Sequence, residues 1–71
     1  RQEDYGDKLI NHENIAALWS IFLRKKITPH DAAMCMALVK VARLMHARKQ
    51  DSYIDLAAYA AIAAEINERT E

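Results

Sequence analysis

The chain has 71 residues, of which 52% are apolar and 28% are charged, and its 10 basic residues are balanced by 10 acidic residues. This composition excludes a disordered chain, which is poor in apolar residues, and a nonspecific nucleic-acid binder, which needs a basic surplus. The longest apolar run has nine residues, too few to span a membrane, and a single cysteine excludes an internal disulfide.

Thirteen alanines beside one glycine and one proline predict an all-α fold, in one helical domain over residues 1–71. Residues 1–9 are expected to form a polar N-terminal segment in which Gly6 marks a turn or a close backbone approach. A first helix is predicted over about residues 11–24, with Asn11 as its cap. Its predicted core face consists of residues at helical spacing, namely Ile15, Leu18, Trp19 and Phe22.

The clearest local signal lies at Thr28, Pro29 and Asp31. Thr28 suits the position that caps a helix, Pro29 suits the first helical position, and Asp31 can bond back to the cap. A second helix is therefore predicted over about residues 29–47, and 12 of its 14 residues from 32 to 45 are apolar.

A third helix is predicted over about residues 51–68, capped by Asp51 or Ser52 after a short polar connection. Its middle and the second helix are apolar nearly all round, as in helices that are buried on every side. Because three helices in so short a chain cannot bury both, we expect a three-helix, bundle-like domain completed by a homodimer or higher oligomer, or by a further helix before Arg1. The alternative is a compact monomer with a large apolar patch.

Charged side chains interrupt these two helices at matching places. Lys40 and Arg43 share one face of the second helix, while Asp51, Asp55 and Tyr59 share one face of the third. An antiparallel hairpin would bring the two sets together. One interpretation is a structural cluster of ion pairs, because buried charges are costly unless they are paired.

The other interpretation is a functional site. Asp51 and Asp55 would hold Mg²⁺ and activate a water molecule for catalysis. Lys40 and Arg43 would bind phosphate groups, and Tyr5 in the polar segment would cover or stack on the ligand. The histidines lack metal-binding spacing, so His12, His30 and His46 are predicted to be solvent-facing or supporting residues. The cysteine, the tryptophan, Phe22 and the methionines are predicted to lie in the core.

Four stretches carry a resemblance to a known family: RQEDYGD, NIAALW, ITPHDAAMCMALVKVARL and DSYIDLAAYAAIAAE. In order and spacing they resemble a small uncharacterised domain that is common in bacteriophages and prophages. The resemblance brings no established activity, and it implies a further helix before Arg1 in the parent protein. Ala58 departs from the family pattern, which often has glycine there. The polar or special positions that recur in that pattern are Arg1, Tyr5, Gly6, Asn14, Lys40, Arg43, Asp51, Asp55 and Tyr59.

The third helix is also distantly similar to the second acidic helix of MazG-type nucleoside triphosphate pyrophosphohydrolases, with Asp55 in the terminal aspartate position. That similarity implies a magnesium site for a nucleotide. The sequence departs from the pattern at Ser52, where an acid is expected, and at Lys40 and Arg43, which stand where the first acidic pair would be.

Two functions therefore remain open. The first is binding of a nucleotide or another phosphate compound with Mg²⁺, through Asp51, Asp55, Lys40, Arg43, Tyr5, Tyr59 and Arg1. The second is a non-enzymatic, oligomeric interaction module in which the charged cluster is structural. In either case we expect a phage- or prophage-encoded protein in the cytoplasm of the bacterial host, without a membrane or nonspecific nucleic acid as a partner.

Overall fold

A computed structural model describes the backbone of residues 2–70 and the side chains of residues 7–69. It contains three helices, α1 (Gln2–Leu23), α2 (Pro29–His46) and α3 (Gln50–Thr70), and no strand among the described residues. The predicted all-α, three-helix fold is therefore confirmed. The described helices include none that is both long and apolar enough to cross a membrane.

The first helix is longer than predicted. It begins at Gln2 rather than near Asn11, so the expected polar segment over residues 1–9 is helical from residue 2 onward and Gly6 lies inside a helix. Asn11 is therefore not a cap. A single glycine costs a helix only about 1 kcal/mol, and the acidic residues 3 and 4 favour a helix start because they oppose the positive end of its dipole.

Helix α1 ends in a left-handed turn that one serine ties to the connecting segment. Arg24 has a positive φ of 58°, a conformation that commonly follows the last residue of a helix. The Ser20 hydroxyl donates to the carbonyl oxygen of Ala16 (2.7 Å) and accepts from the backbone amide of Ile27 (2.8 Å). These bonds direct the chain back toward the start of α2.

The start of α2 forms as predicted. The Thr28 side chain accepts a hydrogen bond from the Asp31 amide at 3.0 Å, and the Asp31 carboxylate accepts one from the Thr28 amide at 3.0 Å. The hydrogen bond from the Thr28 amide, followed by that of the Thr28 side chain, lowers the pKa of Asp31 from its ordinary value of 3.8. The helix ends at His46, and Ala47 takes an extended conformation.

The third helix begins one residue earlier than predicted. Gln50 is its first residue, so neither Asp51 nor Ser52 is the cap, and both lie in its first turn. The Ser52 amide donates to the carbonyl oxygen of Lys49 at 3.1 Å, which starts the helix there. Ser52 is buried, whereas Asp51 remains exposed to solvent.

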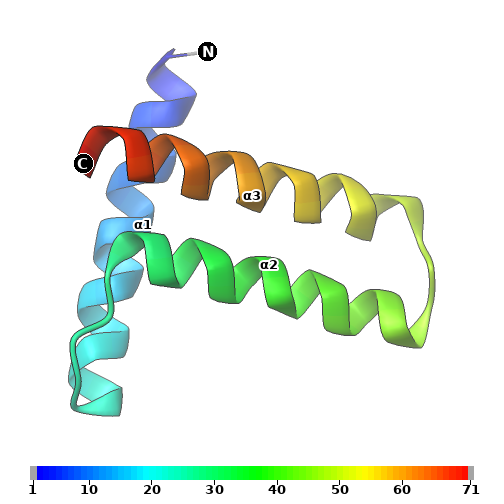
Figure 1. The fold of residues 1–71 in the computed structure, drawn as a ribbon, viewed down its shortest axis with the longest axis horizontal. Coiled ribbons are helices and arrows are strands. Elements are labelled where there is room, and N and C mark those ends of the chain that lie inside the picture. Colours follow the sequence, from blue (N-terminus) through cyan, green and yellow to red (C-terminus); the bar gives the residue numbers. More distant parts are fainter. Residues whose placement is uncertain (1, 71) are drawn as a thin grey trace.

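Helices α2 and α3 lie side by side as an antiparallel hairpin, and α1 crosses behind one end of it (Figure 1). The second half of α1 extends beyond α2, and the loop end of the hairpin lies far from α1. Alanine lets helix axes approach closely because its side chain is small. The core cluster is accordingly compact and comprises Ala33, Ile62, Ala63 and Ile66, with Leu9 and Tyr59 packed against it.

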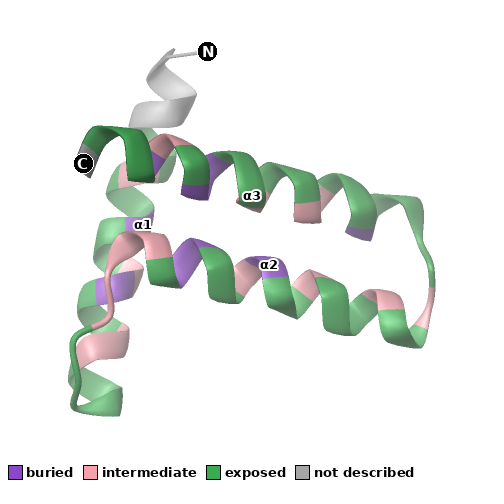
Figure 2. Cartoon of the chain, in the orientation of Figure 1, coloured by how far each residue is buried: buried purple, intermediate pink, exposed green. Residues whose placement is uncertain are grey.

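The core is built from small residues while large apolar residues lie outside it. Among the described residues the buried hydrophobic set contains five alanines and only two larger side chains, Ile62 and Ile66. Exposed positions dominate the surfaces of α2 and α3 away from the crossing with α1 (Figure 2). The predicted core face of the first helix is therefore wrong in part, since Leu18 is 65% exposed and Phe22 is 84% exposed.

The same correction applies to other predicted core residues. Cys35 is exposed, as are Met34 and Met45, whereas Met36 and Trp19 are half-buried. The physical reason is that α2 directs its alanines, and not its bulky side chains, toward the other two helices. An apolar helix can pack through either kind of face, and close approach through alanines leaves the bulky face outside.

Candidate functional site

The hairpin brings one cation of α2 to one carboxylate of α3. The Lys40 ammonium lies 3.0 Å from the Asp55 carboxylate, with side-chain exposures of 18% and 47%. The short connection between the helices places the end of α2 beside the start of α3, as the sequence predicts. Because Asp55 is nearly half exposed, solvent screens this pair, and such pairs contribute only about 0.2–1 kcal/mol.

The other two members of the predicted cluster do not join this pair. Among the described residues the ion pairs are Lys40 with Asp55 and Arg69 with Glu65, so Arg43 and Asp51 have no ionic partner there. Asp51 is exposed at the start of α3, where a negative charge is favourable. In the part of the chain whose side chains are described, no three His, Cys, Asp or Glu residues lie together as a group that could hold a metal ion.

Tyr59 lies apart from Asp51, although the two share a predicted face. It is half-buried against the core and meets the ring of His12 edge to face, with ring centres 5.9 Å apart. His12 is only 3% exposed, so the prediction that it faces solvent is wrong. His30 is half-buried and His46 is exposed.

The environment of His12 fixes the role of each ring nitrogen. Nδ1 lies 2.7 Å from the Lys8 carbonyl oxygen, which can only accept, so Nδ1 carries the proton and donates. Nε2 is buried and has no hydrogen-bond partner. A pocket of about 300 Å³ adjoins this residue between α1 and α3, and its lining includes Asn11, Asp55 and Tyr59.

Two predicted ligand-binding residues, Arg1 and Tyr5, have side chains outside the described residues. Their contribution to a site therefore stays a prediction.

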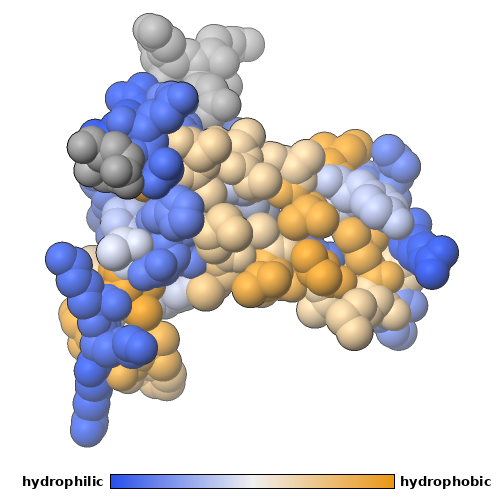
Figure 3. All heavy atoms as spheres, viewed as in Figure 1, coloured by the Kyte–Doolittle hydropathy of each residue, from blue (hydrophilic) through white to orange (hydrophobic). Residues whose placement is uncertain are grey.

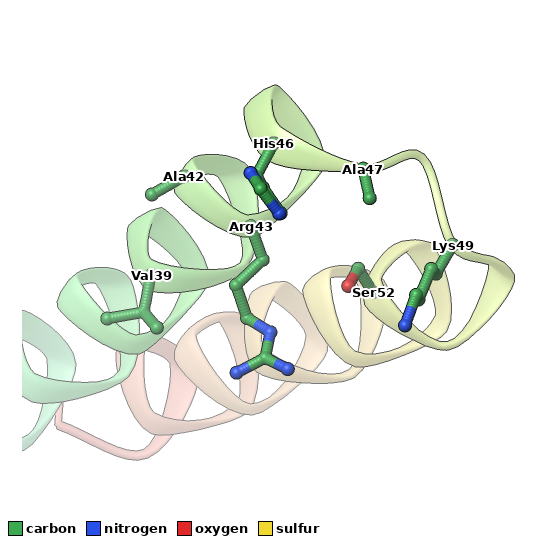
Figure 4. Close-up of a pocket in the computed structure, with 7 residues that line it drawn as sticks. All are labelled: Val39, Ala42, Arg43, His46, Ala47, Lys49 and Ser52. Atoms are coloured by element: carbon green, nitrogen blue, oxygen red, sulfur yellow. The ribbon is translucent and has the colours of Figure 1, made fainter.

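A second hollow lies at the loop end of the hairpin, and the sequence did not predict it. This groove has a volume of about 460 Å³ and is open to solvent. Figure 4 shows Arg43 on one side of it, with Ser52 and Lys49 on the other. None of its seven lining residues is acidic: Val39, Ala42, Arg43, His46, Ala47, Lys49 and Ser52. We call it the hairpin-end groove.

Sequence reasoning missed His12 and Lys49 as residues that line pockets. A signal for His12 was present, because His12, Ala16 and Trp19 follow one another at steps of four and three and so share a helix face. Lys49 lies in the connection between helices, where no periodic pattern applies, so its position depends on where α3 begins.

Three helices, in which an α2–α3 hairpin is crossed by α1, define a small all-α domain. The chain belongs to the family described as "Domain of unknown function (DUF6378)", which matches residues 1–67. The resemblance to an uncharacterised domain family is thereby confirmed, whereas the similarity to MazG-type enzymes stays a prediction.

Relatives of the chain are phage proteins. It is 45% identical over 64 residues to the Gene 55 protein of Mycobacterium phage L5, an alignment that covers 87% of this chain and 41% of that protein. It is 38% identical over 69 residues to the Gene 55 protein of Mycobacterium phage D29, which covers 96% of this chain and 46% of the relative. The chain thus spans less than half the length of these relatives. No solved structure matches it.

Proposed function

We propose that this chain is a non-enzymatic self-association domain in which a second copy of the chain covers one face of the α2–α3 hairpin. The observation that carries the proposal is the inverted placement of the apolar residues. Among the described residues, twelve large hydrophobic side chains are exposed, seven of them on α2 and α3, while five of the seven buried hydrophobic residues are alanines. A monomeric protein rarely leaves so many large apolar side chains in water.

Four of the exposed large hydrophobic side chains of α2 form a stripe. Met34, Leu38, Val41 and Met45 recur at steps of four, three and four, so they share one face of the helix. Their exposed fractions are 43%, 62%, 37% and 84%. This spacing is the one by which helices pack along a shared seam.

The neighbouring face of α3 is apolar but flat. Ala57, Ala60 and Ala64 are exposed and recur at steps of three and four after Tyr53. Figure 3 views the hairpin from the side opposite α1, and hydrophobic side chains extend there over both α2 and α3. We call this surface the hairpin face, and we define it by the α2 stripe and these α3 residues.

A bulky ridge beside a row of alanines is complementary to a second copy of itself. A two-fold axis that lies in the plane of the hairpin face, parallel to its helices, would lay the α2 ridge of each copy on the α3 alanines of the other. The residues that define the face carry no charge, so two copies would meet without repulsion. A different protein could bind to the α2 ridge alone or to the α3 alanines alone. Because the hairpin face has both, its shape favours a second copy of the chain.

A magnesium-dependent nucleotide site at Asp51 and Asp55 stays a prediction with less support. Lys40, one of the two predicted phosphate ligands, pairs with Asp55 at 3.0 Å, and Asp51 lies exposed without an ionic partner among the described residues. A Lys–Asp pair is also what the structural interpretation of the cluster requires.

The test is to introduce a charge at one position of the hairpin face and measure the mass in solution. Size-exclusion chromatography with light scattering is expected to give a dimer or higher oligomer for the unmodified chain and a monomer for Leu38→Glu. Glutamate is a good helix former, so helicity measured by circular dichroism should be retained. The matched control is Ile10→Glu, because Ile10 is 56% exposed but lies on α1.

Two results would overturn the proposal. The first is a monomeric unmodified chain at all concentrations. The second is an oligomer that resists Leu38→Glu and dissociates on Phe22→Glu, since Phe22 lies on the free end of α1 and the contact would then be there.

A further inference from the structure

The hairpin-end groove holds cations that no carboxylate of the described residues neutralises. Arg43 and Lys49 both line the groove, and neither belongs to the ion pairs found in that part of the chain. Asp51 is the acid nearest in sequence to Lys49, and it is not among the lining residues. The end of α2 and the start of α3 meet here with opposite helix dipoles, so the charge of the groove comes from side chains.

Part of the groove lining is apolar. Val39 and Ala42 come from α2 and Ala47 from the connection, and the Ser52 hydroxyl lies between Arg43 and Lys49 in Figure 4. The volume of about 460 Å³ lies within the range of pockets that take small organic ligands. The groove thus offers an anion-binding side and an aliphatic surface within one site.

We propose that the hairpin-end groove binds a small amphipathic organic anion, whose phosphate or carboxylate group contacts Arg43 and Lys49 and whose apolar part lies on Val39 and Ala42. Arg43 can form two parallel hydrogen bonds to such a group, and Lys49 adds a point charge. The groove does not suit the free end of α1 from another copy. That end is followed by Arg24, Lys25 and Lys26, which would meet like charges.

This proposal goes beyond self-association and does not compete with it. The groove residues Val39, Arg43 and His46 recur at steps of four and three, and they lie on a different face of α2 from Leu38 and Met45. A second copy on the hairpin face would leave the groove open. No acidic residue lines the groove, so binding of the anion requires no Mg²⁺.

The experiment is a titration of the ¹⁵N-labelled chain followed by NMR. Hexyl phosphate and hexanoate are the probes. Inorganic phosphate has an anionic group without the alkyl chain, and hexanol has the alkyl chain without the charge. We expect saturable shifts of the amides around Ala47, Lys49 and Ser52 with at least one of the two anions, without Mg²⁺. The tighter of the two probes identifies the preferred acid group. Inorganic phosphate and hexanol should bind more weakly than the tighter of the two probes.

Matched variants decide whether the cations act as proposed. The double variant Arg43→Gln, Lys49→Gln should weaken binding of the better probe at least about tenfold, since charged hydrogen bonds are lost. Lys26→Gln removes an exposed cation that does not line the groove, and it should leave the affinity unchanged. Absence of saturable shifts, shifts that survive the double variant, or equal binding of hexanol would each overturn the proposal.

Discussion

Leu38 offers a sharp test, because its side chain is mostly exposed in a single copy of the chain and contributes little to the stability of that copy. It is 62% exposed, so covering it with a second copy would remove nearly two thirds of the side chain from water. Full burial of a leucine is worth about 1.5–3 kcal/mol, so the gain is about 1–2 kcal/mol per copy and about 2–4 kcal/mol in a symmetric dimer. Leu38→Ala should therefore raise the dissociation constant about 30- to 700-fold.

The assay is thermal unfolding at several protein concentrations, followed by Trp19 fluorescence and circular dichroism. For a self-associating chain Tm rises with concentration, because association stabilises the folded state. Leu38→Ala should flatten that rise. At the lowest concentrations the association no longer stabilises the unmodified chain, so the two Tm values should approach each other. The substitution itself should not weaken α2, since alanine is a slightly better helix former than leucine.

The control for this assay is Ile10→Ala, in which a residue of similar exposure is truncated on α1. It should keep the concentration dependence intact. Equal Tm curves for Leu38→Ala and the unmodified chain at high concentration would refute the reasoning, because position 38 would then be exposed to water in both chains.

Three further predictions concern single interactions. A double-mutant cycle on Lys40 and Asp55 should give a coupling of about 0.2–1 kcal/mol that declines with added salt, and salt-independent coupling would contradict the partly exposed pair. The pKa of Asp31 is lowered in the folded state, so its contribution is full above 3.8 and is lost as pH falls through the lowered folded value. Acid titration of Tm should therefore show a steeper loss for the unmodified chain than for Asp31→Asn, and parallel curves would count against the Thr28 hydrogen bonds. Replacing His12 by leucine removes a buried, unpartnered Nε2, and calorimetry should show an equal or higher Tm; a marked loss of Tm would indicate a partner for that nitrogen.

Local chemistry made the start of α2 predictable. The bonds between Thr28 and Asp31 join residues three apart, so the sequence alone specifies them. The start of α1 is not specified in this way: Gly6 indicates a turn, but one glycine is a small cost in a helix of 22 residues. The Lys40–Asp55 pair was predictable because a short connection fixes how α2 meets α3.

The packing faces could not be predicted in the same way. Helix α2 is apolar nearly all round, so its periodicity does not distinguish the side that faces Ile62 and Ile66 from the side that faces outward. Ala33 lies in the core and Leu38 outside it, because the helices lie too close together to leave room for a leucine side chain between them. The distance between helices cannot be read from the periodicity of one helix. The hairpin-end groove likewise depends on where α3 begins, which no motif in the sequence specifies.

The most direct measurement of the central claim is the mass of the unmodified chain by sedimentation equilibrium over a wide range of concentrations. We predict an average mass that rises from 8.1 kDa toward at least twice that value as concentration increases. A mass of 8.1 kDa throughout that range, in a chain shown by circular dichroism to be helical, would contradict self-association through the hairpin face.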